Sequence, residues 1–374
     1  MVWLPPLFDP SGTTTAAVKL RARLDAFQAA NPGLTIQIRI KAVSGPGGLL
    51  DSLNATAPAA PGNLPALIAL PRADLETAAL KGLIYPLDGL TQETDAPDWY
   101  AYAHQLSVIQ GDAYGLPFAG DAVLLMYRSA MAPTPPADWQ ALFKLNLPLA
   151  FPAADPQGML ALQLYLSAGG SIKDDQGRPA LQVEALTETL KVFADGLKLG
   201  TFSGGLAQYQ TDGQAAQAYH EQPPRAQWLV SWSSRFLSEL PADTLAEAVP
   251  SLRSKPYTLA TGWVWALAEP NLELRPAAVK LAEYLVQSDF LAQWTAAAGY
   301  LPTRPSSLAA WSNQTLTSIL SPILLAAQAR PSNDLLSSLG PVLRDATMQM
   351  LKPGADPAQV AQAAAERLAA PPAK

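Results

Sequence analysis

The sequence contains no cysteine and only two histidines, His104 and His220, which lie far apart along the chain. The absence of cysteine excludes disulfides, thiol catalysis and thiolate metal sites. Two isolated histidines leave almost nothing from which to build a Ser-His-Asp triad or a histidine-rich zinc site. We therefore expect no catalytic activity, no metal and no cofactor.

Long apolar runs and blocks of like charge are also missing. No stretch reaches the roughly 18 apolar residues that would indicate a membrane-spanning helix. The net charge is −6, from 25 basic and 31 acidic residues without a block of either sign. Nucleic acid and anionic membrane surfaces are therefore not expected as partners.

What remains is a long, apolar, folded chain. Its 374 residues suffice for two domains, and 49% hydrophobic against 15% charged residues argues against disorder. The first residues, Met1 to Pro5, show neither a basic n-region nor an apolar h-region. We expect either a cytoplasmic protein or one whose signal segment has been removed.

The first third of the chain alternates helices and strands. Apolar spacing predicts a helix over residues 15–30 and a strand over 34–40 whose alternate residues face solvent. It further predicts a buried strand over 66–70 and a helix over 74–81. This order predicts a parallel sheet, in which ligands bind beyond the carboxyl ends of the strands. That rule selects Asp9 and Ser11 after the first apolar segment, and Arg72 and Asp74 after residues 66–70. For Asp74, helix N-capping is the favoured alternative.

Residues 109–131 form the stretch that we interpret as a hinge. Pro117 interrupts regular hydrogen bonding, Gly120 permits unusual backbone angles, and an apolar run follows Asp121. A strand would end at Pro117, and a new strand would begin after Asp121, which is left beside the gap as a candidate ligand-binding residue. An ordinary strand–loop–strand within one domain is the alternative.

A second series of strands and helices follows the hinge stretch. A buried strand at 147–151 is followed by Asp155 and Gln157, and a strand at 226–232 ends in Trp232. A further strand at 257–268 places Trp263 and Trp265 on one face. Asp155, Gln157, Trp232 and Trp263 are therefore candidate ligand-binding residues. Each tryptophan could equally lie in a hydrophobic core.

Taken in order, several short motifs resemble the sugar-binding group of extracytoplasmic solute-binding proteins of ABC importers, the maltose-binding-protein-like family. The resemblance spans nearly the whole chain. It rests on FQAANPG at 27–33, GLIYPLDGL at 82–90, YGLPF at 114–118 running into LMYR at 125–128, AGG at 168–170, GW at 262–263 and GYLPTR at 299–304.

The resemblance implies a two-lobed α/β periplasmic-binding-protein fold with hinge crossings and a ligand cleft between the lobes. The crossings would lie near residues 118–121, 261–263 and 304–311. One lobe would comprise residues 1–118 and 264–305, and the other 119–263 and 306–374. The partners would be a mono- or oligosaccharide and a membrane permease. The protein would be a monomer located outside the cytoplasm, with a signal segment, often lipidated, in the precursor only.

A sugar needs polar partners for its hydroxyls and aromatic planes for its C–H faces. The predicted ligand-binding residues are Asp9, Ser11, Arg72, Asp74, Asp121, Asp155, Gln157, Trp232 and Trp263. A polyamine-binding protein of the same fold is the alternative, and a glycoside-acting enzyme is a more distant one. A ferric-ion site is disfavoured, because no adjacent tyrosines occur.

Overall fold

The computed structural model describes residues 1–132, 134–239, 243–253 and 255–370. The chain divides into two compact units. Unit 1 comprises Met1–Ala122 and Ala260–Arg330, and unit 2 comprises Val123–Leu259 and Pro331–Lys374. The chain changes unit at 122/123, 259/260 and 330/331, whereas the sequence placed these changes at 118/119, 263/264 and 305/306. The contacts thus keep the segment after residue 305 with unit 1 as far as Arg330.

Unit 1 is a mixed sheet covered by helices on both faces. Its strands lie in the order β2-β1-β3-β10-β6. Strand β1 runs parallel to β2 and β3, while β10 runs antiparallel to β3 and β6. The elements are β1 (Val2–Leu4), α1 (Thr15–Ala30), β2 (Ile38–Ile40), α2 (Leu49–Ala59), β3 (Leu67–Pro71), α3 (Arg72–Leu80), α4 (Ala101–Ser107), β4 (Val108–Ile109), β5 (Asp112–Ala113), β6 (Gly115–Arg128), β10 (Thr258–Leu267), α10 (Arg275–Leu285), α11 (Ser288–Ala298), α12 (Pro305–Ala309), α13 (Gln314–Ala326) and β11 (Ala327–Ala329).

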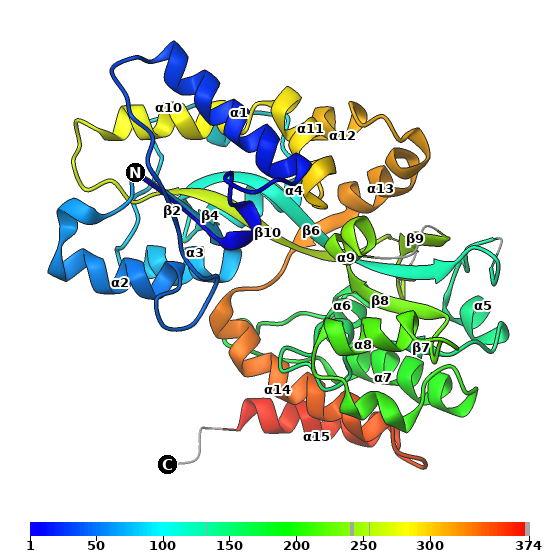
Figure 1. Ribbon diagram of the computed structural model, residues 1–374. Helices are drawn as coiled ribbons and strands as arrows, with labels where there is room; N and C mark the ends of the chain where they lie inside the picture. Colours follow the sequence, from blue (N-terminus) through cyan, green and yellow to red (C-terminus); the bar gives the residue numbers. More distant parts are fainter. Residues whose placement is uncertain (133, 240–242, 254, 371–374) are drawn as a thin grey trace. The chain divides into compact units, whose positions relative to one another are not determined.

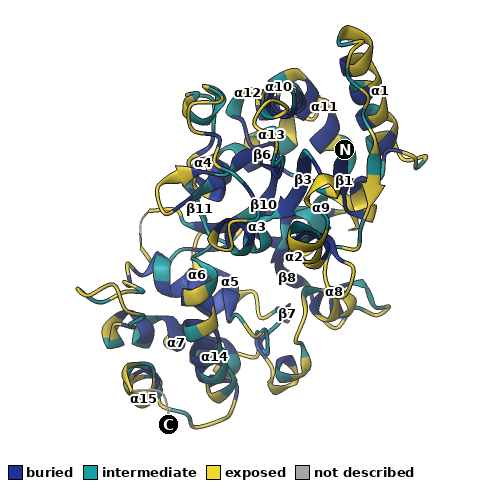
Figure 2. Ribbon diagram, turned by 90° about the vertical axis from the view of Figure 1, so that its left-hand side faces the viewer, coloured by how far each residue is buried: buried dark blue, intermediate teal, exposed yellow. Residues whose placement is uncertain are grey.

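In unit 1, α1, α10 and α11 pack together on one face of the sheet, and α2 and α3 lie on the other (Figure 1). Helix α1 shows why the sequence folds this way. The Thr14 side chain accepts a hydrogen bond from the Ala17 N–H and so caps the helix. The buried residues of the helix are those predicted from apolar spacing: Ala17, Leu20, Leu24 and Phe27. Figure 2 shows the central strands of this unit as buried and the outer surface of α1 as exposed.

The predicted strand over residues 34–40 is correct only in part. Regular strand structure is confined to β2, and Ile40 keeps 38% of its surface exposed. Because β2 is the outermost strand of the sheet, α1 covers its apolar face incompletely. The alternating isoleucines therefore border a groove instead of the core.

The second half of β6 belongs to unit 2, where it pairs with β8 and β9, and β8 pairs in parallel with β7. Helices α6, α7, α14 and α15 pack on one another, and α8 packs on β7 and β8. The elements are α5 (Trp139–Lys144), β7 (Leu149–Ala150), α6 (Met159–Ser167), α7 (Val183–Lys198), α8 (Asp212–His220), β8 (Trp228–Trp232), α9 (Ser233–Ser238), β9 (Thr244–Ala248), α14 (Asn333–Met350) and α15 (Pro357–Ala369).

The prediction that a strand ends at Pro117 is wrong. Strand β6 runs unbroken from Gly115 to Arg128 and is buried along nearly its whole length. Its pairing with β10 shifts by one residue beside Pro117, which lies opposite Val264. A bulge of this kind leaves room for a residue without an N–H. The continuous strand passes from unit 1 into unit 2 between Ala122 and Val123.

Candidate functional site

The carboxyl end of β3 in unit 1 leads directly into α3 and a buried ion pair. Arg72, the first residue of α3, lies 3.1 Å from the Glu76 carboxylate through its Nη1 atom. Both residues are more than nine-tenths buried, and the buried Arg72 Nε has no hydrogen-bond partner among the described residues. Burial lowers the pKa of the Arg72 guanidinium, and the Glu76 charge opposes that shift. The pair places a charged, incompletely satisfied group at the predicted ligand-binding edge.

Two further charged residues adjoin this pair. Burial raises the pKa of the Asp74 carboxyl, and the positive charge of Arg330 acts in the opposite direction. The same Arg330 charge also lowers the pKa of Arg72. Pro71 occupies the N-cap position of α3, so the expectation that Asp74 caps the helix is wrong. The helix begins two residues earlier than the spacing suggested, which puts Asp74 inside its first turn.

Trp263 lies beside this cluster in the sheet, since β10 pairs it with Pro71 on one side and Ala119 on the other. Its ring meets Phe8 edge-on at 5.0 Å between centroids, and its side chain hydrogen-bonds Tyr300. Only 8% of Trp263 is exposed. The ring thus belongs to an aromatic group around Phe8 and presents a small part of its surface.

Asp121 is paired with Thr261 in the sheet and is 9% exposed. Burial raises the pKa of Tyr300 to about 12, and the Asp121 charge adds to that shift. Burial likewise raises the pKa of Tyr102, with a smaller contribution from Asp121. The Asp121 charge thus acts on two phenols, and its carboxylate oxygens can accept hydrogen bonds.

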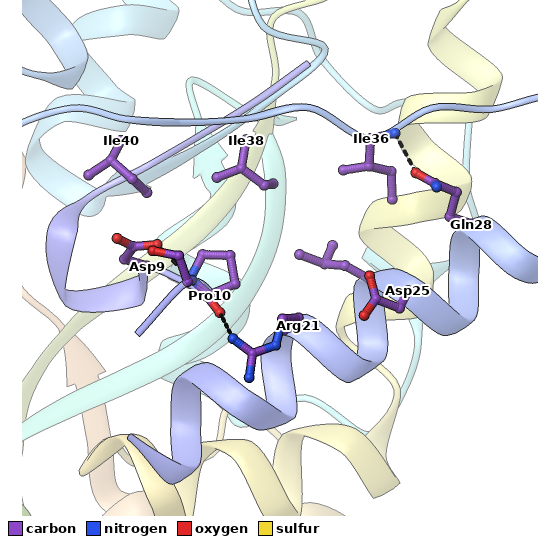
Figure 3. A pocket seen from close by; sticks show the side chains of 10 residues that line it. Asp9, Pro10, Arg21, Asp25, Gln28, Ile36, Ile38 and Ile40 are labelled. Carbon is purple, nitrogen blue, oxygen red and sulfur yellow. Dashed lines mark hydrogen bonds between the residues drawn. The ribbon is translucent and has the colours of Figure 1, made fainter. Parts of the chain in front are cut away.

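Asp9 and Ser11 lie elsewhere in unit 1, beside a groove between α1 and β2 (Figure 3). One Asp9 oxygen accepts a hydrogen bond from the Ser11 N–H at 2.8 Å, which fixes the turn. Arg21 donates to the Pro10 carbonyl in the same turn. Both predicted residues therefore help to build the loop after β1 and also border this groove.

In unit 2, Asp155 and Gln157 lie in the loop after β7. The two carboxylate oxygens of Asp155 accept hydrogen bonds from the N–H groups of Gln157 and Met159, each at 3.0 Å. Asp155 therefore holds the loop onto the start of α6. Close packing fixes the loop as well, because a Cβ on Gly340 of α14 would meet the Pro156 carbonyl oxygen at 2.5 Å.

Trp232, at the end of β8, is half-buried. Beside it, the Ser231 hydroxyl donates to the Asp212 carboxylate at 2.8 Å. Burial raises the pKa of Asp212, the Asp155 charge raises it further, and Ser231 and Arg235 oppose the shift. This edge of unit 2 thus combines an aromatic ring, a hydroxyl and a desolvated carboxylate.

Three residues in these clusters were missed by sequence reasoning: Glu76, Arg330 and Asp212. The spacing of Glu76, four residues after Arg72 on one helix, is a signal that could have revealed it. Asp212 is the first residue of α8, where acidic residues are common, and so attracts no attention. For Arg330 no local signal exists, because only the fold brings it near α3.

Within the described residues, no group of three or more His, Asp or Glu side chains could hold a metal ion. None of the helices in the same part of the chain is long and apolar enough to cross a membrane.

Comparison with protein families gives a match over most of the chain. A model described as bacterial extracellular solute-binding protein matches residues 22–317. The chain belongs to this family. As a bacterial extracellular solute-binding protein, it is a binding protein located outside the cytoplasm. The comparison with curated protein sequences gives no match.

Solved structures similar to this solute-binding protein share its fold at low sequence identity. The sugar-binding protein MalE from Xanthomonas citri has a TM-score of 0.80 at 16% identity, over 98% of this chain and 95% of that one. The cyclic α-maltosyl-1,6-maltose binding protein from Arthrobacter globiformis has a TM-score of 0.74 at 18% identity, over 98% and 97%. UgpB from Mycobacterium tuberculosis, in complex with glycerophosphocholine, has a TM-score of 0.73 at 15% identity, over 98% and 97%. These matches confirm the predicted two-lobed periplasmic-binding fold.

Proposed function

We propose that this solute-binding protein captures a carbohydrate and delivers it to the membrane permease of an ABC importer, without catalysing a reaction. The observation that carries the proposal is the edge of unit 1, where Arg72, Asp74, Glu76 and Arg330 lie beside Trp263, which is 8% exposed. Carboxylates and guanidinium groups bind sugar hydroxyls, and an aromatic plane packs on the sugar C–H face.

The corresponding edge of unit 2 offers the same combination. Asp212 and Ser231 supply oxygens, and the half-buried Trp232 supplies an aromatic ring. We propose Asp212 as the principal carboxylate of this edge in place of Asp155, since both Asp155 oxygens already accept main-chain hydrogen bonds. Asp9, Ser11, Asp121 and Gln157 stay candidates for ligand contact.

The balance of charge favours a neutral ligand over a polyamine. In unit 1 the carboxylates of Asp74 and Glu76 are accompanied by the cations of Arg72 and Arg330. A polyamine site requires an excess of carboxylates, since each ammonium group of the ligand needs a negative partner. Two of the similar structures are sugar-binding proteins by name, which supports the same choice.

A thermal-shift screen over a carbohydrate library, followed by titration calorimetry, tests the proposal. Binding to the native state raises the free energy of unfolding by about 2.7 kcal/mol when the ligand is at 100 times its Kd. We expect stabilisation by one or a few mono- or oligosaccharides. Stabilisation by spermidine or glycerophosphocholine alone would contradict the carbohydrate assignment, and turnover of a glycoside would contradict a purely binding role.

The assigned edges are tested on the sugar found in the screen. Replacing Arg72 by Met or Asp212 by Asn should each lower affinity by about ten- to a hundredfold, equal to roughly 1.4–2.8 kcal/mol. Asp175→Ala, which removes an exposed carboxylate elsewhere in unit 2, provides the control.

A further inference from the structure

The groove between α1 and β2 has an apolar wall and a volume of about 350 Å³. Ile36, Ile38 and Ile40 project side by side toward α1, as Figure 3 shows. Leu24 completes the apolar wall from the helix. Ile40 is exposed, and Ile36 and Ile38 are half-buried, so all three leave apolar surface in water.

The edge of β2 that faces away from β1 pairs with no other strand among the described residues. Strand β1 bonds the Gln37 carbonyl and the Lys41 N–H, at 2.8 and 2.9 Å. In a parallel ladder, residues that alternate with these point their main-chain groups to the opposite edge. The N–H and C=O groups of Ile38 and Ile40 therefore face outward, and no described strand pairs with that edge. The edge is closed at both ends, because the Gln28 side-chain oxygen accepts from the Ile36 N–H at 2.9 Å and the Ala42 carbonyl, bridged to Gly48, accepts from the Leu49 N–H at 2.9 Å.

The charges around the edge differ between its two faces. On the face away from α1, Arg39 is exposed and Lys41 is half-buried, 5.0 Å above the Trp3 ring. On the groove face, Arg21 and Asp25 are exposed on α1, and no ion pair within the described residues joins them. A strand added next to β2 would meet aliphatic side chains on one face and cations on the other.

We propose that this edge binds an extended peptide segment of a partner protein in which aliphatic and acidic residues alternate. The peptide's main chain bonds Ile38 and Ile40, and its aliphatic side chains fill the groove beside the three isoleucines. Its acidic side chains lie on the other face, opposite Arg39 and Lys41, where unlike charges stabilise cross-strand pairs. A second copy of β2 is a poorer occupant, because it would place further cations on that face. The proposal does not depend on the identity of the sugar.

The test uses a short, end-blocked, fluorescently labelled peptide of alternating valine and glutamate, with fluorescence anisotropy as the readout. We expect saturable binding to the full-length protein that weakens as salt is added, since the ion pairs are exposed. Ile38→Pro should weaken binding about tenfold or more, because it removes an outward donor without touching the bonds to β1. Ile38→Val keeps both the N–H and the aliphatic side chain, and should bind like the original protein.

Reversing the charge of one residue distinguishes specific peptide binding from nonspecific adhesion. Arg39→Glu should lose affinity for the valine–glutamate peptide and gain affinity for a valine–lysine peptide. Binding that is absent, or that ignores Ile38→Pro and Arg39→Glu, overturns the proposal. Self-association of the protein alone that Ile38→Pro abolishes would assign the edge to a second copy and overturn it as well. Sugar affinity, measured on the same Ile38→Pro protein, should stay unchanged and so keeps this test separate from the proposed function.

Discussion

At the scale of single residues, Trp263 and Trp232 differ in burial, and the consequences of replacing them should differ accordingly. Trp263 is 8% exposed and packs on Phe8, whereas Trp232 is half-buried at a strand end. We expect Trp263→Ala to lower the free energy of unfolding by roughly 3–5 kcal/mol. Trp232→Ala should change stability little but weaken sugar binding by about 1–3 kcal/mol.

Thermal melting without ligand and calorimetry with ligand, on both variants, separate these outcomes. Trp263→Phe keeps much of the buried volume and serves as the milder control for packing. Strong destabilisation by Trp232→Ala would remove that ring from the site and make it a core residue.

Asp212 provides a pH-dependent prediction. Its pKa is raised in the folded protein, so the folded state holds the proton more tightly than the unfolded chain does. The ionised group therefore costs stability above the folded-state pKa, and this cost disappears as pH falls below the unfolded-state value. Asp212→Asn should be more stable than the original protein at neutral pH, and the difference should shrink in acid.

Urea unfolding of both proteins across that pH range measures the effect. The Asn side chain can still accept the Ser231 hydrogen bond, so the comparison isolates the charge. A variant that is less stable at neutral pH would show that Asp212 is a stabilising structural carboxylate instead of a desolvated binding group.

At the scale of single elements, the start of α6 depends on one carboxylate. Asp155 accepts two main-chain hydrogen bonds there, from Gln157 and Met159. Asp155→Ala should cost about 1 kcal/mol or more of stability, because the two N–H groups lose their hydrogen-bond acceptor. Asp175→Ala removes the same charge from an exposed position and should be nearly neutral. Chemical denaturation of the two variants checks this, and an equal cost for both would contradict the role of Asp155 in holding the loop.

Gly120 in β6 is required for close packing, not for hinge freedom. A Cβ at this position would lie 2.0 Å from the Tyr102 hydroxyl oxygen, which is fully buried. Gly120→Ala should destabilise the protein by about 1–3 kcal/mol through overpacking. Adding Tyr102→Phe removes the obstructing oxygen and should restore part of the loss in a denaturant titration. Gly33→Ala, where a Cβ meets nothing within 4 Å, provides the control. No recovery in the double variant would argue against this contact.

At the scale of the whole molecule, we expect ligand-driven closure. Two units joined by three chain segments can rotate about those segments when a ligand contacts both. Small-angle scattering should give a smaller radius of gyration at saturating sugar than without it. A sugar that gives no thermal shift serves as the control. An unchanged profile at saturation, with binding verified by calorimetry, would contradict closure.

Features that depend on local pattern could be predicted from the amino-acid sequence. Apolar spacing predicted α1 with its buried face, and the apolar run 66–70 predicted β3, because each element must bury its own stripe. The order of motifs pointed to the solute-binding fold. The rule that ligands bind beyond the carboxyl ends of parallel strands selected Arg72, and the resemblance selected Trp263 by placing it at a crossing; both stay predictions as ligand contacts.

Features that depend on distant neighbours could not be predicted and became visible in the folded chain. Pro117 stays within β6 because its partner β10 shifts register beside it, a fact absent from the local sequence. Ile38 is only half-buried and Ile40 is exposed because β2 is the last strand in the sheet. Arg330 reaches the α3 cluster across more than two hundred residues of chain. Strand register, the position of a strand at the sheet edge and charge effects between distant residues are properties of the folded chain. A short stretch of sequence therefore cannot predict them.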